Sequence, residues 1–219
     1  MKKGMKKETK SDMKKEIKLR ELILPNKKIN FFVITILLLG IISGAIFLML
    51  ANETDKNSVI TQIQTFFKNI ANNSIDNGLA LKNSLIINYI FVGTIWILGL
   101  SMIGIIFNIF LTYIKGFLVG FSVSSIILTY GPKGLLASIL YTFPSQVFNI
   151  IVIIILSIYS IMFANNLLKI IGSKKGNNRL MLKKYIVILM FCIMLSFISS
   201  LLEVYVFPNI LKLVISIYV

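Results

Sequence analysis

Residues 95–121 read IWILGLSMIGIIFNIFLTYIKGFLVGF, and the fold class follows from this stretch. It is apolar almost throughout, and Lys115 is its one formal charge. Its glycines are Gly99, Gly104, Gly116 and Gly120. In hydrocarbon every backbone amide needs a partner inside the protein, and a helix supplies that partner within its own segment. The stretch therefore predicts lipid-embedded helices, and Lys115 predicts a point where the chain reaches the membrane surface between two crossings.

The composition of the whole chain also indicates a membrane protein. Its 219 residues are 57% hydrophobic and 14% charged, with a mean hydropathy of +0.87. Soluble domains are about a quarter charged. The net charge of +15 would suggest a nucleic-acid partner in a soluble protein. Here the basic residues gather in two clusters that flank apolar segments, and no nucleic-acid-binding motif accompanies them, so we expect no nucleic-acid partner.

Several apolar segments are long enough to cross a bilayer as helices. They cover about residues 31–50, 86–114, 116–130, 145–168 and 185–207. At about 1.5 Å per residue the second exceeds a hydrocarbon core of about 30 Å, so it must tilt, kink near Gly99 or Gly104, or enter the interface. The segments predict an all-α, polytopic integral membrane bundle of about five transmembrane helices. It forms a single domain over residues 31–219, behind a basic tail at residues 1–30.

The basic residues predict the orientation of the bundle. Cytoplasmic loops of membrane proteins are enriched in lysine and arginine. The loop after the fourth segment carries Lys169, Lys174, Lys175, Arg179, Lys183 and Lys184. Five crossings place this loop and the basic tail on the cytoplasmic side and the C-terminus outside. A re-entrant hairpin over residues 116–143 would place the basic loop outside, so the charges favour five crossings.

Residues 51–85 form the one sizeable polar stretch between the predicted spans. Within it one helical face carries Val59, Ile63, Phe66, Phe67 and Ile70, and a polar turn, NNSIDNG, follows. The pattern predicts an interfacial helix packed on the bundle. The functional alternative is a docking surface for an extracytoplasmic partner.

Small residues predict where helices approach closely. Gly40 and Gly44 form a GxxxG pair in the first span, and Gly116 and Gly120 form a second pair. Such pairs let two helix backbones come into contact. We expect helix-packing roles for these residues and for Gly99 and Gly104. Association of two copies of the chain through the first pair is the alternative.

A few further residues are candidates for polar or structural roles in the membrane: Lys115, Gln146, Glu203, Tyr205 and Pro208. Glu203 is the one acid in a predicted span, and a carboxylate in hydrocarbon costs at least about 2.5 kcal/mol. We expect it to serve as a hydrogen-bonding group that faces protein or water. We expect Lys115 to reach the cytoplasmic interface with its long side chain. Transport of a substrate past Glu203 and Lys115 is the alternative.

The sequence contains no recognisable catalytic motif. It contains no histidine and one cysteine, Cys192, which excludes serine–histidine triads and histidine metal sites. A lone acid in the spans cannot make a paired-carboxylate site. We therefore expect no catalytic, cofactor or metal site, and a protein that is not an enzyme.

The order of several short motifs resembles a known family. These motifs are WILGLSMIG at 96–104, LTYIKGFLVGF at 111–121, GLL at 134–136, YTFP at 141–144 ahead of Gln146, and LEVYVFP at 202–208. Their order and spacing are similar to those of stage II sporulation protein M, over nearly the whole chain below the tail.

The resemblance implies an integral membrane protein of endospore formers that acts in engulfment of the forespore. Members of the family work with stage II sporulation proteins D and P, which degrade septal peptidoglycan, and anchor them at the septal and engulfing membrane of the mother cell. We therefore expect a multi-pass scaffold in the cell membrane whose partners are lipids and these two proteins, with a homo-oligomer left open. The alternative is a small transporter or permease subunit.

Overall fold

The structure is a computed structural model that describes residues 27–173 and 178–218, and these residues form helices and no strands. The long helices are α2 (Lys27–Leu50), α4 (Asn77–Gly99), α5 (Gly104–Tyr130), α7 (Phe143–Ser173) and α8 (Asn178–Leu201). Five helical segments of the described chain are long and apolar enough to cross a membrane. The predicted all-α bundle with five spans is confirmed.

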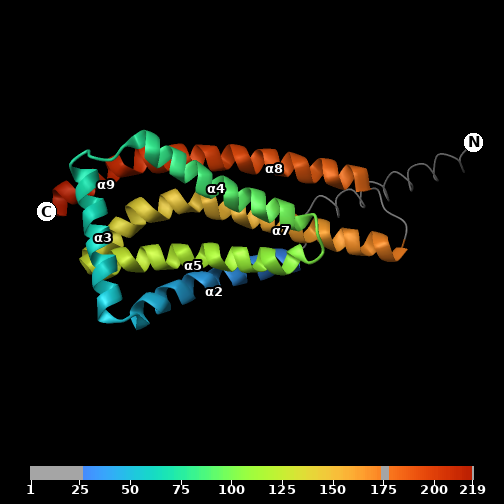
Figure 1. Ribbon diagram of the computed structural model, residues 1–219, viewed down its shortest axis with the longest axis horizontal. Helices are drawn as coiled ribbons and strands as arrows, with labels where there is room; N and C mark the ends of the chain where they lie inside the picture. Colours follow the sequence, from blue (N-terminus) through green and yellow to red (C-terminus); the bar gives the residue numbers. More distant parts are fainter. Residues whose placement is uncertain (1–26, 174–177, 219) are drawn as a thin grey trace, which may run out of the picture.

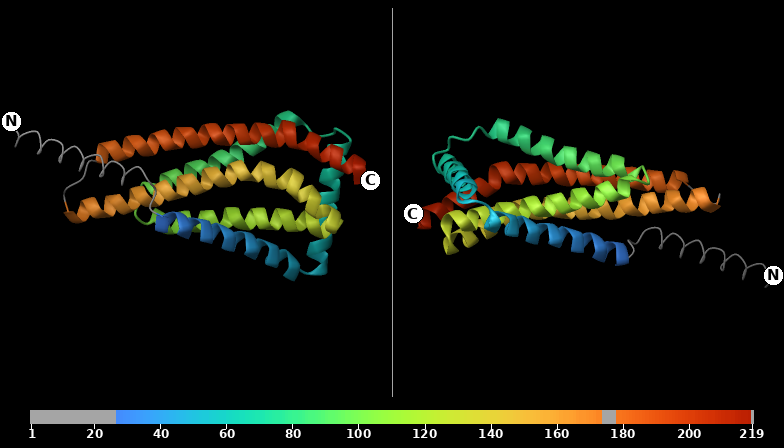
Figure 2. Two further views of the ribbon diagram at one scale, coloured as in Figure 1. Left: turned by 180° about the vertical axis from the view of Figure 1, so that it is seen from behind. Right: turned by 60° about the horizontal axis from the view of Figure 1, so that its bottom comes forward.

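The two ends of the bundle differ in what covers them (Figures 1 and 2). Helix α3 (Glu53–Ala71) crosses one end roughly perpendicular to the long helices, beside the short helices α6 (Pro132–Ala137) and α9 (Phe207–Tyr218). We call this the α3 end. At the opposite end, the amino end, α2 begins and α4 turns back into α5.

Helix α7 is the centre of the bundle. Half of its most apolar window is buried, compared with 17–33% in the other spanning segments. Its Val152, Ile153 and Leu156 pack in one core cluster with Ile95 of α4 and Cys192 of α8. The outer helices keep apolar side chains exposed, as lipid contact requires.

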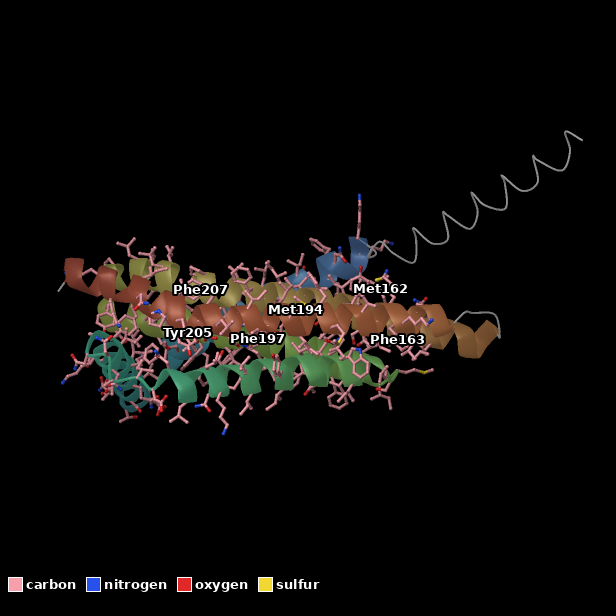
Figure 3. The ribbon with its side chains drawn as sticks, turned by 90° about the horizontal axis from the view of Figure 1, so that it is seen from above. Met162, Phe163, Met194, Phe197, Tyr205 and Phe207 are labelled. Atoms are coloured by element: carbon pink, nitrogen blue, oxygen red, sulfur yellow. The ribbon has the colours of Figure 1, made fainter. Side chains whose placement is uncertain are left out.

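Helix α8 illustrates this exposed apolar surface. Met194 is 66% and Phe197 44% exposed, and in Figure 3 both lie midway along the bundle. In the same view Met162 and Phe163 lie toward the amino end.

The predicted boundary between the second and third spans is wrong. We expected spans at 86–114 and 116–130 joined at a cytoplasmic Lys115–Gly116 junction, but α4 ends at Gly99 and α5 runs unbroken through Lys115. The chain reverses at residues 100–103, where the Ser101 hydroxyl accepts a hydrogen bond at 2.9 Å from the amide of Gly104, the first residue of α5. Three of the four turn residues are apolar, so hydropathy does not mark the turn.

Other predicted boundaries move by smaller steps. α2 begins at Lys27, inside the predicted tail, and the rest of that tail, residues 1–26, lies outside the described residues. The basic loop residues 174–177 also lie outside them. α4 begins at Asn77 rather than near residue 86, because the Asp76 carboxylate accepts hydrogen bonds from the Gly78 and Leu79 amides at 2.8 and 3.2 Å.

Helix α3 is held on the bundle by its apolar face. Phe67 and Ile70 are buried against Ile126 of α5, Ala137 of α6 and Leu211 of α9. The predicted helix packed on the bundle is confirmed, while its position at the membrane interface stays a prediction. Polar side chains on its opposite side are exposed.

Two π-helical turns in the described chain each stand just ahead of a proline. η1 (Ser138–Thr142) precedes Pro144, and η2 (Leu202–Val206) precedes Pro208. Proline donates no backbone hydrogen bond and its ring clashes with the preceding turn, so the helix widens or kinks there. Helix α8 therefore continues through η2 into α9, beyond the predicted end at residue 207.

Candidate functional site

The two GxxxG pairs face each other inside one chain. A Cβ atom on Gly40 would lie 2.3 Å from the backbone oxygen of Tyr113 and 3.1 Å from the Cα of Gly116. A Cβ atom on Gly44 would lie 2.1 Å from the backbone oxygen of Phe117. Helix α2 therefore touches α5 backbone to backbone.

The contact is reciprocal from the side of α5. A Cβ atom on Gly116 would lie 2.3 Å from the backbone oxygen of Leu37, and one on Gly120 would lie 2.0 Å from that of Ile41. Backbone atoms cannot move aside as a flexible side chain can. This face of α2 is thus occupied by α5 and is not available to a second copy of the chain.

Gly99 and Gly104 serve other contacts. A Cβ atom on Gly99 would lie 2.2 Å from both the Ser160 and Tyr185 hydroxyls, so α4 approaches α7 and α8 closely here. A Cβ atom on Gly104 would lie 1.7 Å from the backbone oxygen of Leu98, within the tight turn between α4 and α5.

Lys115 is buried in the bundle, and the expectation that it reaches the cytoplasmic interface is wrong. It is 6% exposed, and its Nζ lies 5.3 Å from the centre of the Phe91 ring on α4, a distance at which the ring face attracts a cation. The physical reason is that α5 continues past Lys115, which places the residue inside a span rather than at its end.

Glu203 is anchored by a polar cluster that joins α4 to the end of α8. The Ser84 hydroxyl donates a hydrogen bond to Glu203 Oε2 at 2.7 Å, and its oxygen lies 3.0 Å from the Ser200 hydroxyl oxygen. Asn88 Nδ2 donates to the Ser200 hydroxyl at 3.0 Å. We call Ser84, Asn88, Ser200 and Glu203 the Glu203 cluster. It gives the carboxylate partners within the protein, as a group in an apolar setting requires.

Two adjoining cavities lie beneath α3, and both are bordered by Phe66, Tyr141 and Glu203. We call them the two lobes of the α3 chamber. The first, of about 410 Å³, is the more polar of the two, although more than half of its lining is apolar, and we call it the polar lobe. Its lining includes Asn69, Asn73, Asn77, Ser84, Asn209 and Lys212. The second, of about 330 Å³, is more apolar and also contains Gln146. Its apolar lining is Val59, Ile63, Phe67, Phe121 and Ile126.

Two of the residues that border both lobes come from the π-helical turns. Tyr141 lies in η1 and Glu203 in η2, so two prolines distant in sequence shape one site. Burial, and then the charge of Glu203, raise the pKa of the Tyr141 phenol above its ordinary value, so the phenol keeps its proton. Tyr205, 47% exposed, and Pro208 border the polar lobe, and Tyr205 lies toward the α3 end in Figure 3.

The structure thus brings together only some of the candidate residues. Gln146, Glu203, Tyr205 and Pro208 border the chamber, whereas the glycines lie at helix contacts and Lys115 borders neither lobe. The residue pattern does not single out Ser84, Asn88, Ser200 or Tyr141. A signal was present, since Ser84 and Asn88 are spaced i, i+4 on one face of a helix, as are Ser200 and Glu203 at i, i+3.

Replacing Glu203 with glutamine is expected to leave the fold nearly unchanged. The amide oxygen of Glu203→Gln can accept the Ser84 hydrogen bond, so the loss should stay near about 1 kcal/mol. Thermal unfolding of the purified protein in detergent measures it. Glu203→Leu cannot accept that bond and should unfold at a clearly lower temperature. Equal losses in the two variants would contradict the hydrogen-bonding role.

Comparison with known protein families identifies the family to which this chain belongs. The family model described as Stage II sporulation protein M matches residues 33–208, which run from α2 to the start of α9 and include most of each spanning helix. No curated protein and no solved structure matches the chain. The family expected from the motifs is confirmed. The chain belongs to the stage II sporulation protein M family, and it is a multi-pass, sporulation-related membrane protein.

Proposed function

We propose that this protein is a non-enzymatic scaffold of the engulfment machinery. It anchors stage II sporulation proteins D and P, which degrade peptidoglycan, at the septal and engulfing membrane of the mother cell. The observation that carries this proposal is the family match over residues 33–208, which extends across the membrane bundle rather than over one motif. The family resemblance supplies the partners and the process.

The distribution of basic residues supports an orientation for the scaffold. Lys27 and Lys28 begin α2, and Lys183 and Lys184 lie near the start of α8, all at the amino end (Figure 1). Lysine and arginine favour the cytoplasmic side of a membrane. In this orientation the α3 end, with α9, faces the extracytoplasmic space in which peptidoglycan lies.

Helix α3 offers a surface on which an extracytoplasmic partner can dock. Six uncharged polar side chains lie together on its exposed side, next to the exposed charges of Asp55 and Lys68, and we call these six the α3 polar face: Thr54, Asn57, Ser58, Thr61, Gln62 and Thr65. The cores of protein interfaces are depleted of charged residues. The buried underside, with Phe67 and Ile70, holds the helix against the bundle, so the face is presented on a fixed support.

Substitution of Thr61 tests this surface. Tagged full-length protein, purified in mild detergent from sporulating cells, is expected to retain proteins D and P, as detected by immunoblot. Thr61→Arg places a large charge in the middle of the α3 polar face and should lower that recovery severalfold at an unchanged protein level.

Asn83→Arg is the matched control, since Asn83 is exposed near the start of α4 and borders neither lobe. Its recovery should equal that of the unsubstituted protein. Failure of the unsubstituted protein to retain either D or P would overturn the scaffold proposal. Equal recovery in both variants would overturn the assignment of the surface.

The alternative function, a small transporter or permease subunit, draws support from the α3 chamber. A permease needs a continuous polar route between its helices. Between the chamber and the amino end stands the apolar cluster that contains Ile95, Leu156 and Cys192, all at 0% exposure. Of the buried polar groups nearby, the Thr112 and Ser157 hydroxyls pair with each other at 2.9 Å and Asn108 Nδ2 donates to the backbone oxygen of Ser157 at 3.4 Å. These contacts favour the scaffold.

A further inference from the structure

Three polar groups face the α3 chamber without a protein partner. Glu203 Oε2 is held by Ser84 at 2.7 Å, which leaves Oε1 without a hydrogen bond among the described residues. The Tyr141 hydroxyl and the Gln146 side-chain amide likewise have no hydrogen-bond partner within the part of the chain that the structure describes. None of the three is among the described side-chain atoms that are closed off from solvent without a partner. They are therefore accessible from the chamber, and a ligand that enters it can form hydrogen bonds with them.

Two aromatic rings border the chamber together with Glu203. Phe66 and Tyr141, whose ring centres are 5.9 Å apart, border both lobes together with Glu203. Ring faces attract cations, and a carboxylate accepts hydrogen bonds from them. A carboxylate beside two aromatic rings is the chemistry that recognises an organic ammonium group.

An inorganic cation fits the chamber less well. Calcium takes six to eight oxygen ligands, and the described residues hold no group of three or more acidic, cysteine or histidine side chains. Each lobe, at about 410 and 330 Å³, is in the size range of sites for small organic molecules.

The rest of the lining adds two further requirements. Lys212 borders the polar lobe, where its Nζ donates to Asn73 Oδ1, so an anionic group close to the ammonium would meet a cation there. The second lobe, lined by Val59, Ile63 and Phe121 among others, suits an apolar portion. Lys115, which would oppose an ammonium ligand, lies over Phe91 and borders neither lobe.

We propose that the α3 chamber is a binding site for a zwitterionic, partly apolar ligand whose primary ammonium group is held by Glu203 between Phe66 and Tyr141. This chemistry occurs in the headgroup of an aminophospholipid and in water-soluble amines that carry an acidic group. The site does not depend on the scaffold role: Glu203, Tyr141 and Gln146 lie beneath α3, and of the α3 polar face only Gln62 also borders the chamber.

Binding to the delipidated full-length protein in detergent tests the proposal. Native mass spectrometry with phosphatidylethanolamine, phosphatidylcholine and phosphatidylglycerol forms the lipid arm, and calorimetric titration with O-phosphoethanolamine forms the soluble arm. We expect phosphatidylethanolamine to bind more tightly than the other two lipids. The ammonium group of phosphatidylcholine carries no N–H to donate, and phosphatidylglycerol has no ammonium group. Binding in the lipid arm alone supports an aminophospholipid, and binding in the soluble arm supports a water-soluble amine. Binding in neither arm overturns the proposal.

Variants assign the binding to this chamber. Glu203→Gln removes the charge but keeps the Ser84 hydrogen bond, and it should weaken binding about tenfold or more. Glu53→Gln is the matched control, because Glu53 is 83% exposed at the start of α3 and borders neither lobe. Tyr141→Phe removes one hydroxyl and should weaken binding by a smaller factor. Unchanged binding in both chamber variants, or an equal loss in Glu53→Gln, would overturn the assignment.

Discussion

A chain carrying Gly116→Leu and Gly120→Leu is expected not to accumulate as a folded membrane protein. At these positions even a Cβ atom would lie 2.3 and 2.0 Å from backbone oxygens of α2, so α2 would have to leave α5. Alanine at either position alone should already cost about 1–3 kcal/mol, the usual penalty for overpacking. Size-exclusion chromatography of the detergent-solubilised protein and its melting temperature measure both effects.

Gly93→Ala is the matched control for these substitutions. Gly93 lies within α4, in the same apolar setting, and a Cβ atom there meets nothing within 4 Å. Its melting temperature should equal that of the unsubstituted protein. A Gly120→Ala chain that melts together with Gly93→Ala would show that α2 and α5 do not touch at their backbones.

Lys115→Glu is expected to prevent folding almost as completely. The substitution replaces a buried cation by a buried anion and loses the contact with the Phe91 ring. Breaking a buried charge arrangement costs about 3–5 kcal/mol. The steady-state level in membranes and the melting temperature in detergent give the measurement.

Two further variants distinguish the effect of the sign of the charge at residue 115 from the effect of its burial. Lys82→Glu makes the same change at an exposed position of α4 and should leave the melting temperature unchanged. Lys115→Met keeps the length of the side chain without a charge and should fold, because removing a buried charge in favour of an apolar group is often neutral. Normal accumulation of Lys115→Glu would mean that Lys115 is not buried beside Phe91.

The sequence by itself determined the class and the main elements of this protein. Hydropathy and the scarcity of charge are averages over about 20 residues, the length of a membrane-spanning helix. Such averages are enough to predict membrane helices, because a single segment in hydrocarbon can satisfy its backbone hydrogen bonds only as a helix. The apolar face of α3 was equally readable, since Phe67 and Ile70 repeat at the helical period. Motif order over residues 96–208 was enough to identify the family.

Only the tertiary structure decided where the second span ends and what Lys115 does. Leu100, Met102 and Ile103 are as apolar as the helices they join. The turn there depends on the hydrogen bond from the Gly104 amide to the Ser101 hydroxyl and on the absence of a side chain at residue 104. A lysine within an apolar run marks either a membrane surface or a buried cation. The choice depends on whether a neighbouring helix offers partners, as Phe91 does here.

The partners of the glycine pairs and the residues of the α3 chamber could also be identified only from the tertiary structure. A GxxxG pair has the same pattern whether its partner is a second chain or a helix more than 70 residues away, as Gly120 is from Gly44. Glu203, Tyr141 and Ser84 come from three separate elements. Their meeting beneath α3 depends on two proline-linked π turns and on how α3 crosses the end of the bundle, and local sequence patterns do not carry such long-range contacts.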